Sequence, residues 1–241
     1  MFKKYGVIIG LCLALVIFAT ACQGDEGTDQ PLPGNGQTNG DTVNGENGEN
    51  GDERDKEEEI ELEYTEEGII KPEIAEKIIE ERATEVIEAL RDQDAYLLSY
   101  FVHEDRGVRF TPYTNVSVEE DVVLSKEEIA EMFESEQEYI WGRYDGKGND
   151  IELTPSEYYE EFIYTADFVN AEQIGYNEIL SSGNMLENQF EVYDDPIIVE
   201  YYFPGFDEDY KGMDWLSLRL VFEQMDDEWY LVGIIHNQWT I

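Results

Sequence analysis

The pattern of apolar and polar positions divides the chain into three parts. An apolar run covers residues 7–18, and a stretch of Gly, Asn, Asp, Glu, Gln and Thr follows over about residues 23–59. Beyond that stretch, apolar residues recur with the periods of helices and strands. We therefore expect a signal peptide over residues 1–21, a disordered acidic tether over residues 22–60 and one folded domain over residues 61–241.

The folded part begins with predicted helices. Apolar residues between positions 74 and 90 follow a helical period, and Pro72 stands at a favoured first helical position. Asp94 can cap a short second helix. Two later segments, 125–128 and 154–157, have the capping-box pattern, in which a Ser or Thr and a Glu three residues later satisfy backbone N–H groups at a helix start. We expect a helix to begin at each of these positions.

The last third of the chain predicts strands. Alternate residues from Leu216 to Phe222 are apolar and would share one face of a half-buried strand, and Asp226-Asp227 marks a tight hairpin. Helices first and an antiparallel meander last favour an α+β fold, in which N-terminal helices pack on one face of a curved antiparallel sheet. Residues 167–183 give no clear pattern. The expected strands cover residues 108–113, 139–144, 190–193, 197–203, 215–222 and 229–236.

Cys22 is the residue on which the predicted location depends. Lys3 and Lys4 precede the apolar run, and Ala19-Thr20-Ala21 leads directly into Cys22. This order is typical of a secretory signal. A cysteine after the cleavage site resembles a bacterial lipobox, which implies fatty acylation (diacylglyceryl and palmitate) of Cys22 and anchoring outside the cell membrane. The same small residues also satisfy an ordinary signal peptidase that leaves no lipid.

The acidic composition limits the partners of the chain. There are 57 Asp and Glu against 15 Lys and Arg, and the formal net charge is −42. Such a field repels nucleic acid and anionic lipid head groups, whereas it attracts cations, basic peptides and amines. The acidity also has a simpler explanation as solubility in a salty or alkaline medium. The other cysteine, Cys12, lies in the predicted signal peptide, so we expect no disulfide in the mature chain.

Several sequence motifs of known chemistry are missing. The sequence has no Gly-rich phosphate loop, no serine nucleophile elbow and no Cys or His spacing typical of a metal site. We therefore expect no cofactor, no bound zinc and no nucleic-acid partner. Residues 145–152 depart from the calcium-loop pattern and are interpreted as a hairpin loop with solvated charges. Weak calcium binding by Asp207, Glu208 and Asp209 together with Asp194 and Asp195 is a minor alternative.

Two segments carry a resemblance to a known superfamily. The segments 103–110 and 227–234, together with the two predicted helices, resemble the cystatin-like cone of the nuclear transport factor 2 and SnoaL-like superfamily. Residues 107–113, 193–215 and 229–241 resemble uncharacterised lipoproteins of Gram-positive bacteria. The resemblance implies a cone-shaped α+β domain with a pocket between sheet and helices. It implies no activity, because this scaffold hosts isomerases, dehydratases, transport adaptors and binding modules.

The implied pocket selects a small set of polar residues. A histidine beside a carboxylate such as Asp214 could carry a proton, but the alternative is that His103 caps a helix end and His236 ends an edge strand. Arg109 and Arg219 could hold a carboxylate ligand or pair with a neighbouring acid. The residues expected to line the pocket or its rim are His103, Arg109, Tyr113, Asp214, Arg219 and His236.

The aromatic loop over residues 203–215 has two interpretations. Its rings could fold back over the open end of the core, which we expect, or form a partner-binding surface. For the whole chain we predict a lipid-anchored, extracytoplasmic binding or interaction module for a small molecule, a peptide or an envelope component. The alternatives are a SnoaL-like pocket enzyme with a His/Asp pair and a structural acidic envelope protein. An enzyme requires an apolar cavity with a His facing an acid, whereas a cone filled with Tyr and Phe would argue against one.

Overall fold

The computed structural model describes residues 60–181 and 183–240. The predicted signal peptide, Cys22 and the predicted tether up to residue 59 lie outside the described residues. Within the described ranges, none of the helices has both the length and the apolar character needed to cross a membrane.

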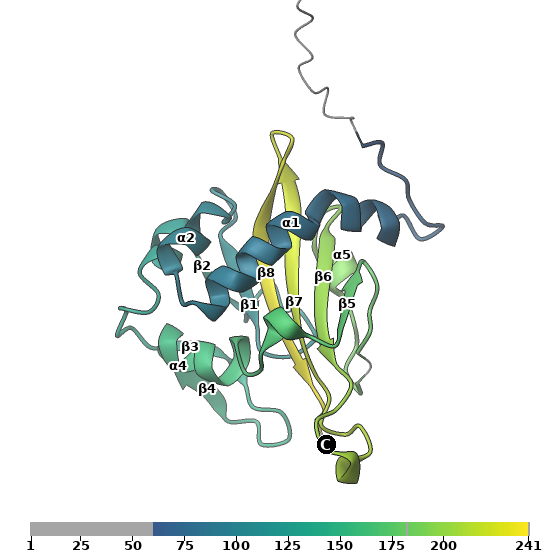
Figure 1. Cartoon of the computed structure of the whole chain (residues 1–241). Helices are drawn as coiled ribbons and strands as arrows, with labels where there is room; N and C mark the ends of the chain where they lie inside the picture. The colour runs from purple at the N-terminus through teal and green to yellow at the C-terminus, as the bar shows by residue number, and fades with distance from the viewer. Residues whose placement is uncertain (1–59, 182, 241) are drawn as a thin grey trace, which may run out of the picture. The chain divides into compact units, whose positions relative to one another are not determined.

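The described chain contains both helices and strands, as Figure 1 shows. The helical segments are α1 (Pro72–Arg91), α2 (Ala95–Tyr100), α3 (Lys126–Ala130), α4 (Pro155–Tyr158), the π-helix η1 (Tyr159–Ile163), η2 (Phe168–Asn170), α5 (Gln189–Val192) and η3 (Glu208–Tyr210). The strands are β1 (Val108–Thr111), β2 (Val122–Leu124), β3 (Tyr139–Arg143), β4 (Asp150–Leu153), β5 (Gln173–Tyr176), β6 (Ile197–Phe203), β7 (Leu216–Met225) and β8 (Glu228–Gln238).

Six strands form one curved sheet in the order β2-β1-β8-β7-β6-β5, and β3 and β4 form a separate hairpin (Figure 1). The meander β6-β7-β8 is antiparallel, as predicted, whereas β1 pairs with β8 in parallel. Because β1 lies on one side of β8 and β7 on the other, β8 is a central strand. The expectation that His236 ends an edge strand is therefore wrong.

Local sequence signals fix the helix starts and the hairpin. Asp94 accepts the Leu97 N–H at 2.9 Å, and complete capping boxes are present at Ser125 and Thr154. Asp226 and Asp227 have φ values of 50° and 66°, the left-handed pair that a tight two-residue hairpin turn requires. These predictions are confirmed.

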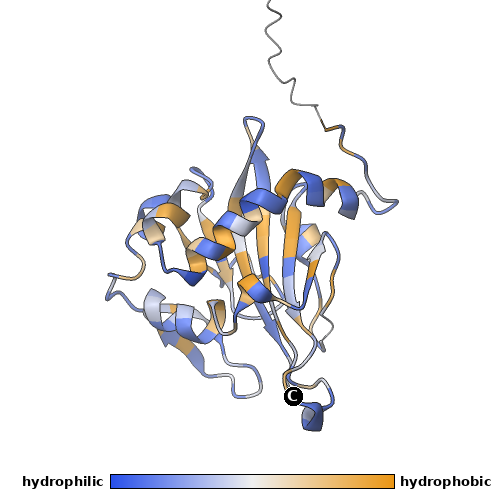
Figure 2. Cartoon of the chain, viewed as in Figure 1, coloured by the Kyte–Doolittle hydropathy of each residue, from blue (hydrophilic) through white to orange (hydrophobic). Residues whose placement is uncertain are grey.

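The first face of the sheet packs against helices. Helix α1 runs across it, and its buried residues such as Ile79, Ala83 and Leu90 belong to the same core as Leu218 and Leu220 of β7. Figure 2 shows apolar positions concentrated on the central strands and on the side of α1 that faces them. The predicted α+β arrangement, with N-terminal helices on one face of a curved sheet, is confirmed.

The second face of the sheet is covered by loops. Val221 of β7 and Ile235 of β8 form a smaller core there with Val116 and Tyr193. Strand β7 is consequently buried on both faces over most of its length, so the prediction of a half-buried strand is wrong. The covering layer supplies polar partners as well as apolar contacts, which the alternation along β7 alone does not reveal.

Residues 190–193 belong to that covering layer and were expected to form a strand, which is wrong. Residues Gln189–Val192 form the short helix α5 instead. The Asn188 side chain accepts from Val116 N and donates to Val116 O, both at 2.8 Å, and fixes where the turn begins. Over so few residues, two apolar side chains in alternation fit one helical turn as well as a strand.

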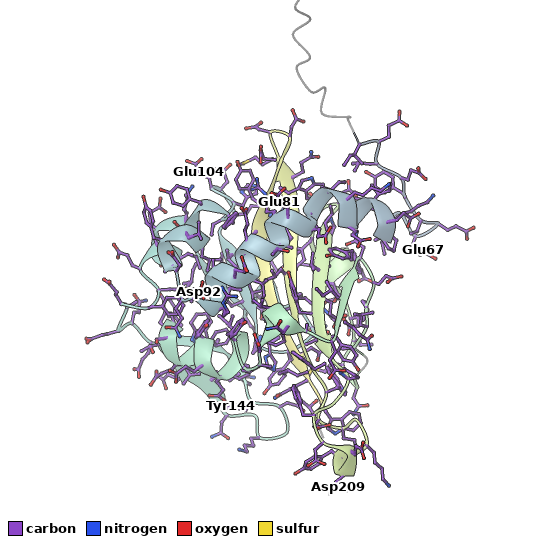
Figure 3. All side chains as sticks on the ribbon, viewed as in Figure 1. Glu67, Glu81, Asp92, Glu104, Tyr144 and Asp209 are labelled. Atoms are coloured by element: carbon purple, nitrogen blue, oxygen red, sulfur yellow. The ribbon has the colours of Figure 1, made fainter. Side chains whose placement is uncertain are left out.

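Strand β7 connects two distinct ends of the sheet. At one end lies the β7–β8 hairpin, where Leu62 near the start of the described chain shares a hollow with Gln224 and Trp229. At the other end lies the β6–β7 loop, residues 204–215. The ten residues of β7 separate these ends by about 34 Å. Figure 3 labels Asp209 at the loop end and Glu67 toward the opposite end.

Candidate functional site

The structure does not gather the six residues predicted for the pocket into one site. Arg109 and Arg219 lie on the second face of the sheet, because Val108, Phe110, Leu218 and Leu220 beside them belong to the core of the first face. The remaining residues lie in three further places, described in turn below: His103, Tyr113, Asp214 and His236.

His103 has a local structural contact. Its Nδ1 lies 3.2 Å from Asp105 N and 3.3 Å from Arg106 N, so the ring accepts from the turn that follows α2. It packs edge-on against Tyr230 at a ring distance of 6.0 Å. Its backbone is joined to Leu231, five positions before His236 along β8, so about 16 Å of strand separates the two histidines.

His236 is buried on the first face of the sheet. Its Nδ1 lies 2.9 Å from Phe162 O, and its Nε2 has no hydrogen-bond partner. Burial lowers the pKa of His236 from the ordinary 6.5 to about 4, so the ring is neutral near pH 7. No carboxylate of the described residues bonds to it, and the alternative of a pair with Asp214 is not formed.

Aromatic rings fill the space around His236. Phe162 contacts it edge-on at 5.6 Å, and Tyr158 stacks on both Trp141 at 4.0 Å and Phe162 at 5.0 Å. Tyr113 packs on the same Phe162 ring at 6.0 Å. Stacked aromatic rings therefore fill the interior of the first face. A cone filled in this way argues against a pocket enzyme. The geometry of His236 lends that alternative no support.

Arg219 forms the centre of a buried polar cluster on the second face. Glu200 stands directly opposite it on β6, and both side chains are fully buried. The Arg219 Nε lies 3.1 Å from Glu200 Oε1, which is an ion-pair distance, although the N–H does not point along that line. The other guanidinium nitrogens donate to Thr114 at 2.9 Å, to Ser181 at 2.9 Å and to Glu187 at 2.5 Å.

Most polar groups of the cluster find their partners within it. Glu200 also accepts from Leu180 N at 2.6 Å and from the Ser181 hydroxyl. Burial by itself lowers the pKa of the Arg219 guanidinium, but the charge of Glu200 and the hydrogen bond to Glu187 more than offset it, and the pKa is raised. Arg219 therefore stays charged and occupied by the protein's own acids, and it is not free to hold a carboxylate ligand.

Arg109 is also occupied by the protein itself. Its Nη1 donates to Ser117 O at 3.2 Å and Val118 O at 3.4 Å, in the loop between β1 and β2. Asp121 closes the same loop by accepting from the Thr111 hydroxyl at 2.6 Å and from Ser117 N at 3.0 Å. Burial raises the pKa of Asp121 to about 6 in spite of these bonds.

The loop between β6 and β7 is the clearest exposed apolar feature. Phe203 and Trp215, at its two ends, are buried. The residues between them are not: Phe206 is 58% exposed, Tyr210 57% and Met213 50%. The expectation that this loop covers the core with its rings is thus wrong for its middle part. Together with Trp239, which is 37% exposed, we call these residues the aromatic tip: Phe206, Tyr210, Met213 and Trp239.

Asp214 determines the shape of the tip. Its Oδ2 accepts from Phe206 N at 2.9 Å and Asp207 N at 2.8 Å, which closes the loop over itself. Gly205 lies under the other oxygen, and a Cβ on Gly205 would come within 2.9 Å of Asp214 Oδ1 and 3.3 Å of Gly212 Cα. The two ends of the loop approach so closely that only glycine fits at position 205. Asp214 therefore closes the loop and is not the partner of a histidine.

A hollow of about 330 Å³ opens beside the tip. Phe206, Met213, Trp215 and Trp239 form apolar walls, and Asp214 is the charged residue among the described side chains that line it. Trp239 N donates to Trp215 O at 3.4 Å, which holds the two tryptophans at the same end of the β7–β8 ladder. Aromatic walls with few polar groups are typical of a small-ligand or partner site.

A larger hollow of about 920 Å³ lies at the hairpin end. Lys77 and Arg82 of α1 line it together with Glu81, Glu228 and Trp229. Arg82 is already paired with Glu228 at 2.5 Å. Its lining is dominated by charged side chains, four acids and two bases, which are well solvated, so this groove is a weaker candidate than the tip.

The acidic segments do not form the joint calcium site considered in the sequence analysis. Asp194 and Asp195 precede β6, whereas Asp207, Glu208 and Asp209 follow it, so the whole strand separates them. In the described ranges, no three His, Cys, Asp or Glu side chains gather closely enough to hold a metal ion. Residues 145–149 form the turn of the β3–β4 hairpin, where Tyr144 N donates to Asn149 O at 2.8 Å.

Comparison with known proteins adds a remote likeness. No protein-family model and no curated protein matches the chain. Among solved structures, it is similar to a Xanthomonas campestris protein described as a calcium/calmodulin dependent protein kinase II association domain. The two are 12% identical with a TM-score of 0.27, and the match covers 66% of this chain and 84% of that one. At that score the likeness is too remote to carry either fold or function.

Sequence reasoning missed the partners of Arg219. Glu200 was the available signal, because it interrupts the otherwise apolar run Ile197–Phe203, and a charge within a buried strand requires an opposite charge. Glu187, Thr114 and Ser181 come from irregular segments that no periodicity identifies.

We expect Arg219→Met to lower the free energy of unfolding by about 3–5 kcal/mol, since it leaves the Glu200 carboxylate buried without its counter-charge. The double variant Arg219→Met/Glu200→Gln should recover part of that loss in urea unfolding. Arg143→Met, which breaks the exposed 3.3 Å pair with Asp150, is the matched control and should change stability by less than about 1 kcal/mol. A similar effect of both arginine substitutions would contradict the role given to the cluster.

The shifted pKa values of His236 and Asp121 predict opposite dependences of the unfolding free energy on pH. Unfolded His236 binds a proton between pH 6.5 and about 4 that the folded state does not bind, so its burial costs stability as the pH falls, up to about 3 kcal/mol. Asp121 binds a proton in the folded state below about pH 6, so its contribution is lost as the pH rises from about 4 to 6.

Relative to the wild type, His236→Phe should lose less stability on acidification from pH 6.5 to 4. Asp121→Asn should lose less on the rise from pH 4 to 6. Urea unfolding followed by tryptophan fluorescence at several pH values measures both slopes. If the unfolding free energy of both variants depends on pH in the same way as that of the wild type, neither group titrates as described.

Proposed function

We propose that this chain is an extracytoplasmic, lipid-anchored binding module that contacts its partner through the aromatic tip. The proposal combines the sequence features of residues 1–60 with the exposed apolar surface of the described domain. It includes the assignment of the curved sheet and α1 to a cystatin-like cone of the nuclear transport factor 2 type, with which the strand and helix arrangement is consistent, and membership of a Gram-positive lipoprotein family.

The exposure of the tip side chains is the observation that carries the proposal. Large apolar side chains that could turn into the core instead stand in solvent, on a loop that Asp214 holds closed. Full burial of one such side chain contributes about 1.5–3 kcal/mol, and the partly exposed tip side chains each forgo a part of that amount. Aromatic residues and Met are also the types enriched at binding surfaces. A partner that covers the tip would recover that free energy.

Helix α2 also exposes aromatic residues but is a weaker candidate for the binding surface than the aromatic tip. The hydroxyl of Tyr100 donates to that of Tyr96 at 2.5 Å, and Lys126 lies 6.0 Å from the Tyr100 ring centroid. These rings already have polar and cationic partners from the protein itself. No hollow of the kind beside the tip accompanies them among the cavities described above.

The position of the tip agrees with an anchor that precedes residue 60. The described chain begins at the hairpin end of β7, and the tip lies at the other end, about 34 Å away along the strand. A flexible tether over residues 22–59 would add roughly 35 Å on average. The tip and the point where the tether would join the domain thus lie at opposite ends of β7.

Replacing Cys22 by Ser should release the full chain from the membrane fraction into the medium, because the lipid is the proposed anchor. Wild-type protein should remain with the membranes, and mass spectrometry should show an acylated N-terminal cysteine. Membrane retention of the Cys22→Ser chain equal to that of the wild type would refute the anchor.

The binding surface is tested in the Cys22→Ser background, so that no lipid causes retention. The labelled full chain is incubated with isolated cell envelopes, and the bound fraction is measured against protein concentration. Replacing Phe206 and Trp239 together by Ala should weaken retention by about tenfold or more, as truncation of central aromatic contacts does.

Tyr96→Ala/Tyr100→Ala is the matched control, because it removes a similar exposed aromatic area from α2. This variant should be retained like the parent chain. If the tip and α2 variants bind equally well, the aromatic tip is not the contact surface and the proposal fails.

A further inference from the structure

We infer that the hollow beside the aromatic tip binds a small organic cation with a methylated ammonium group, such as choline or tetramethylammonium. The inference rests on the proposed function, since it names the ligand chemistry of the same surface. Three features carry it: the nature of the walls, the sign of the local charge and an incompletely satisfied carboxylate.

The walls have the chemistry that a quaternary ammonium group requires. Such a group donates no hydrogen bond, so it is held by aromatic faces and polarizable atoms rather than by a ring of acceptors. Phe206, Trp215 and Trp239 supply aromatic rings, and Met213 supplies a thioether. The hollow of about 330 Å³ has room for a small head group, and its remaining polar side chains are few.

The local charge has one sign. No Lys or Arg is among the described residues that line the hollow. The adjoining loop carries Asp207, Glu208, Asp209 and Asp214 against Lys211, and the whole chain has a formal charge of −42. A field of this sign concentrates cations at the tip and repels anions. An anionic ligand would meet the carboxylates without a compensating base.

Asp214 places a fixed carboxylate at the wall of the hollow. Its Oδ2 is satisfied by two backbone N–H groups, but its buried Oδ1 has no hydrogen-bond partner. A cation bound in the hollow would compensate this carboxylate without needing a hydrogen bond to it. The cation–π contacts within the described chain lie elsewhere, at Arg82 and Lys126. Phe206 packs on Phe203 at 5.2 Å and Trp215 on Tyr202 at 6.2 Å, so Trp239, which has neither kind of contact among the described residues, is the ring that we expect to contribute most.

The test measures binding of choline chloride and tetramethylammonium chloride to the full chain in a maltoside detergent, by calorimetry and tryptophan fluorescence. The matched probe is 3,3-dimethylbutan-1-ol, which has the shape of choline without the charge. Choline should bind saturably and the alcohol at least about tenfold more weakly. Equal binding of both, or no saturable choline binding, would overturn the inference.

Variants locate the site. Trp239→Leu should weaken choline binding by about fivefold or more, and Trp239→Phe should restore part of it because a ring face returns. Asp214→Asn should weaken it by about tenfold, whereas Asp209→Asn, an exposed acid of the same loop outside the hollow, should weaken it by less than about twofold. Thermal unfolding of each variant checks that the fold is intact. Equal loss with Asp209→Asn would assign the effect to general charge and contradict the site.

The outcome is separable from that of the proposed function. If choline does not bind but Phe206→Ala/Trp239→Ala still abolishes envelope retention, the cation inference falls and the binding surface stands. If choline binds and excess choline displaces the chain from envelopes, the ligand group belongs to an envelope component. If choline binds without displacement, the ligand is a free solute. Both of these last results support the cation site.

Discussion

The buried charge of Arg219 is the constraint on which the second face of the sheet depends. A guanidinium stays protonated, and burying it unpaired costs several kcal/mol, so its partners must be in place whenever the strands are. Those partners come from β6, from the loop after β1 and from the long segment between β5 and β6. One ion therefore specifies how two otherwise irregular segments cover the sheet.

The two faces of the sheet are covered by different kinds of interaction, with the same result. The first face is filled by apolar and aromatic side chains under α1, and the second is closed by the Arg219 cluster and a small apolar core. With both faces covered, the space beside His236 is filled by aromatic rings. The exposed and shaped surface is displaced to the ends of the strands, where loop residues are free of the packing demands of the sheet. This is why we propose the binding surface at the tip and not in the interior beside His236.

The sequence predicted those features that depend on local signals. Pro72, Asp94 and the two capping boxes began helices where expected, and the Asp-Asp turn joined the last two strands. The errors concern long-range contacts. His236 could not be placed in a central strand without knowing that β1 returns beside β8, and α5 forms because Asn188 reaches Val116. For the site, the aromatic character of the tip was visible, but its exposure depends on Asp214 closing a loop, which periodicity does not encode.

The position of β8 in the middle of the sheet also bears on how the chain acquires its structure. Strand β1 spans Val108–Thr111, yet its parallel partner β8 spans Glu228–Gln238, far later in the chain. Without β8 there is no bridge between the β2–β1 pair and β6–β7, so the six-stranded sheet closes only when these distant segments meet. Pairings of such high sequence separation form slowly. Closure of the sheet therefore depends on a contact between distant segments, which no short stretch of the chain can supply by itself.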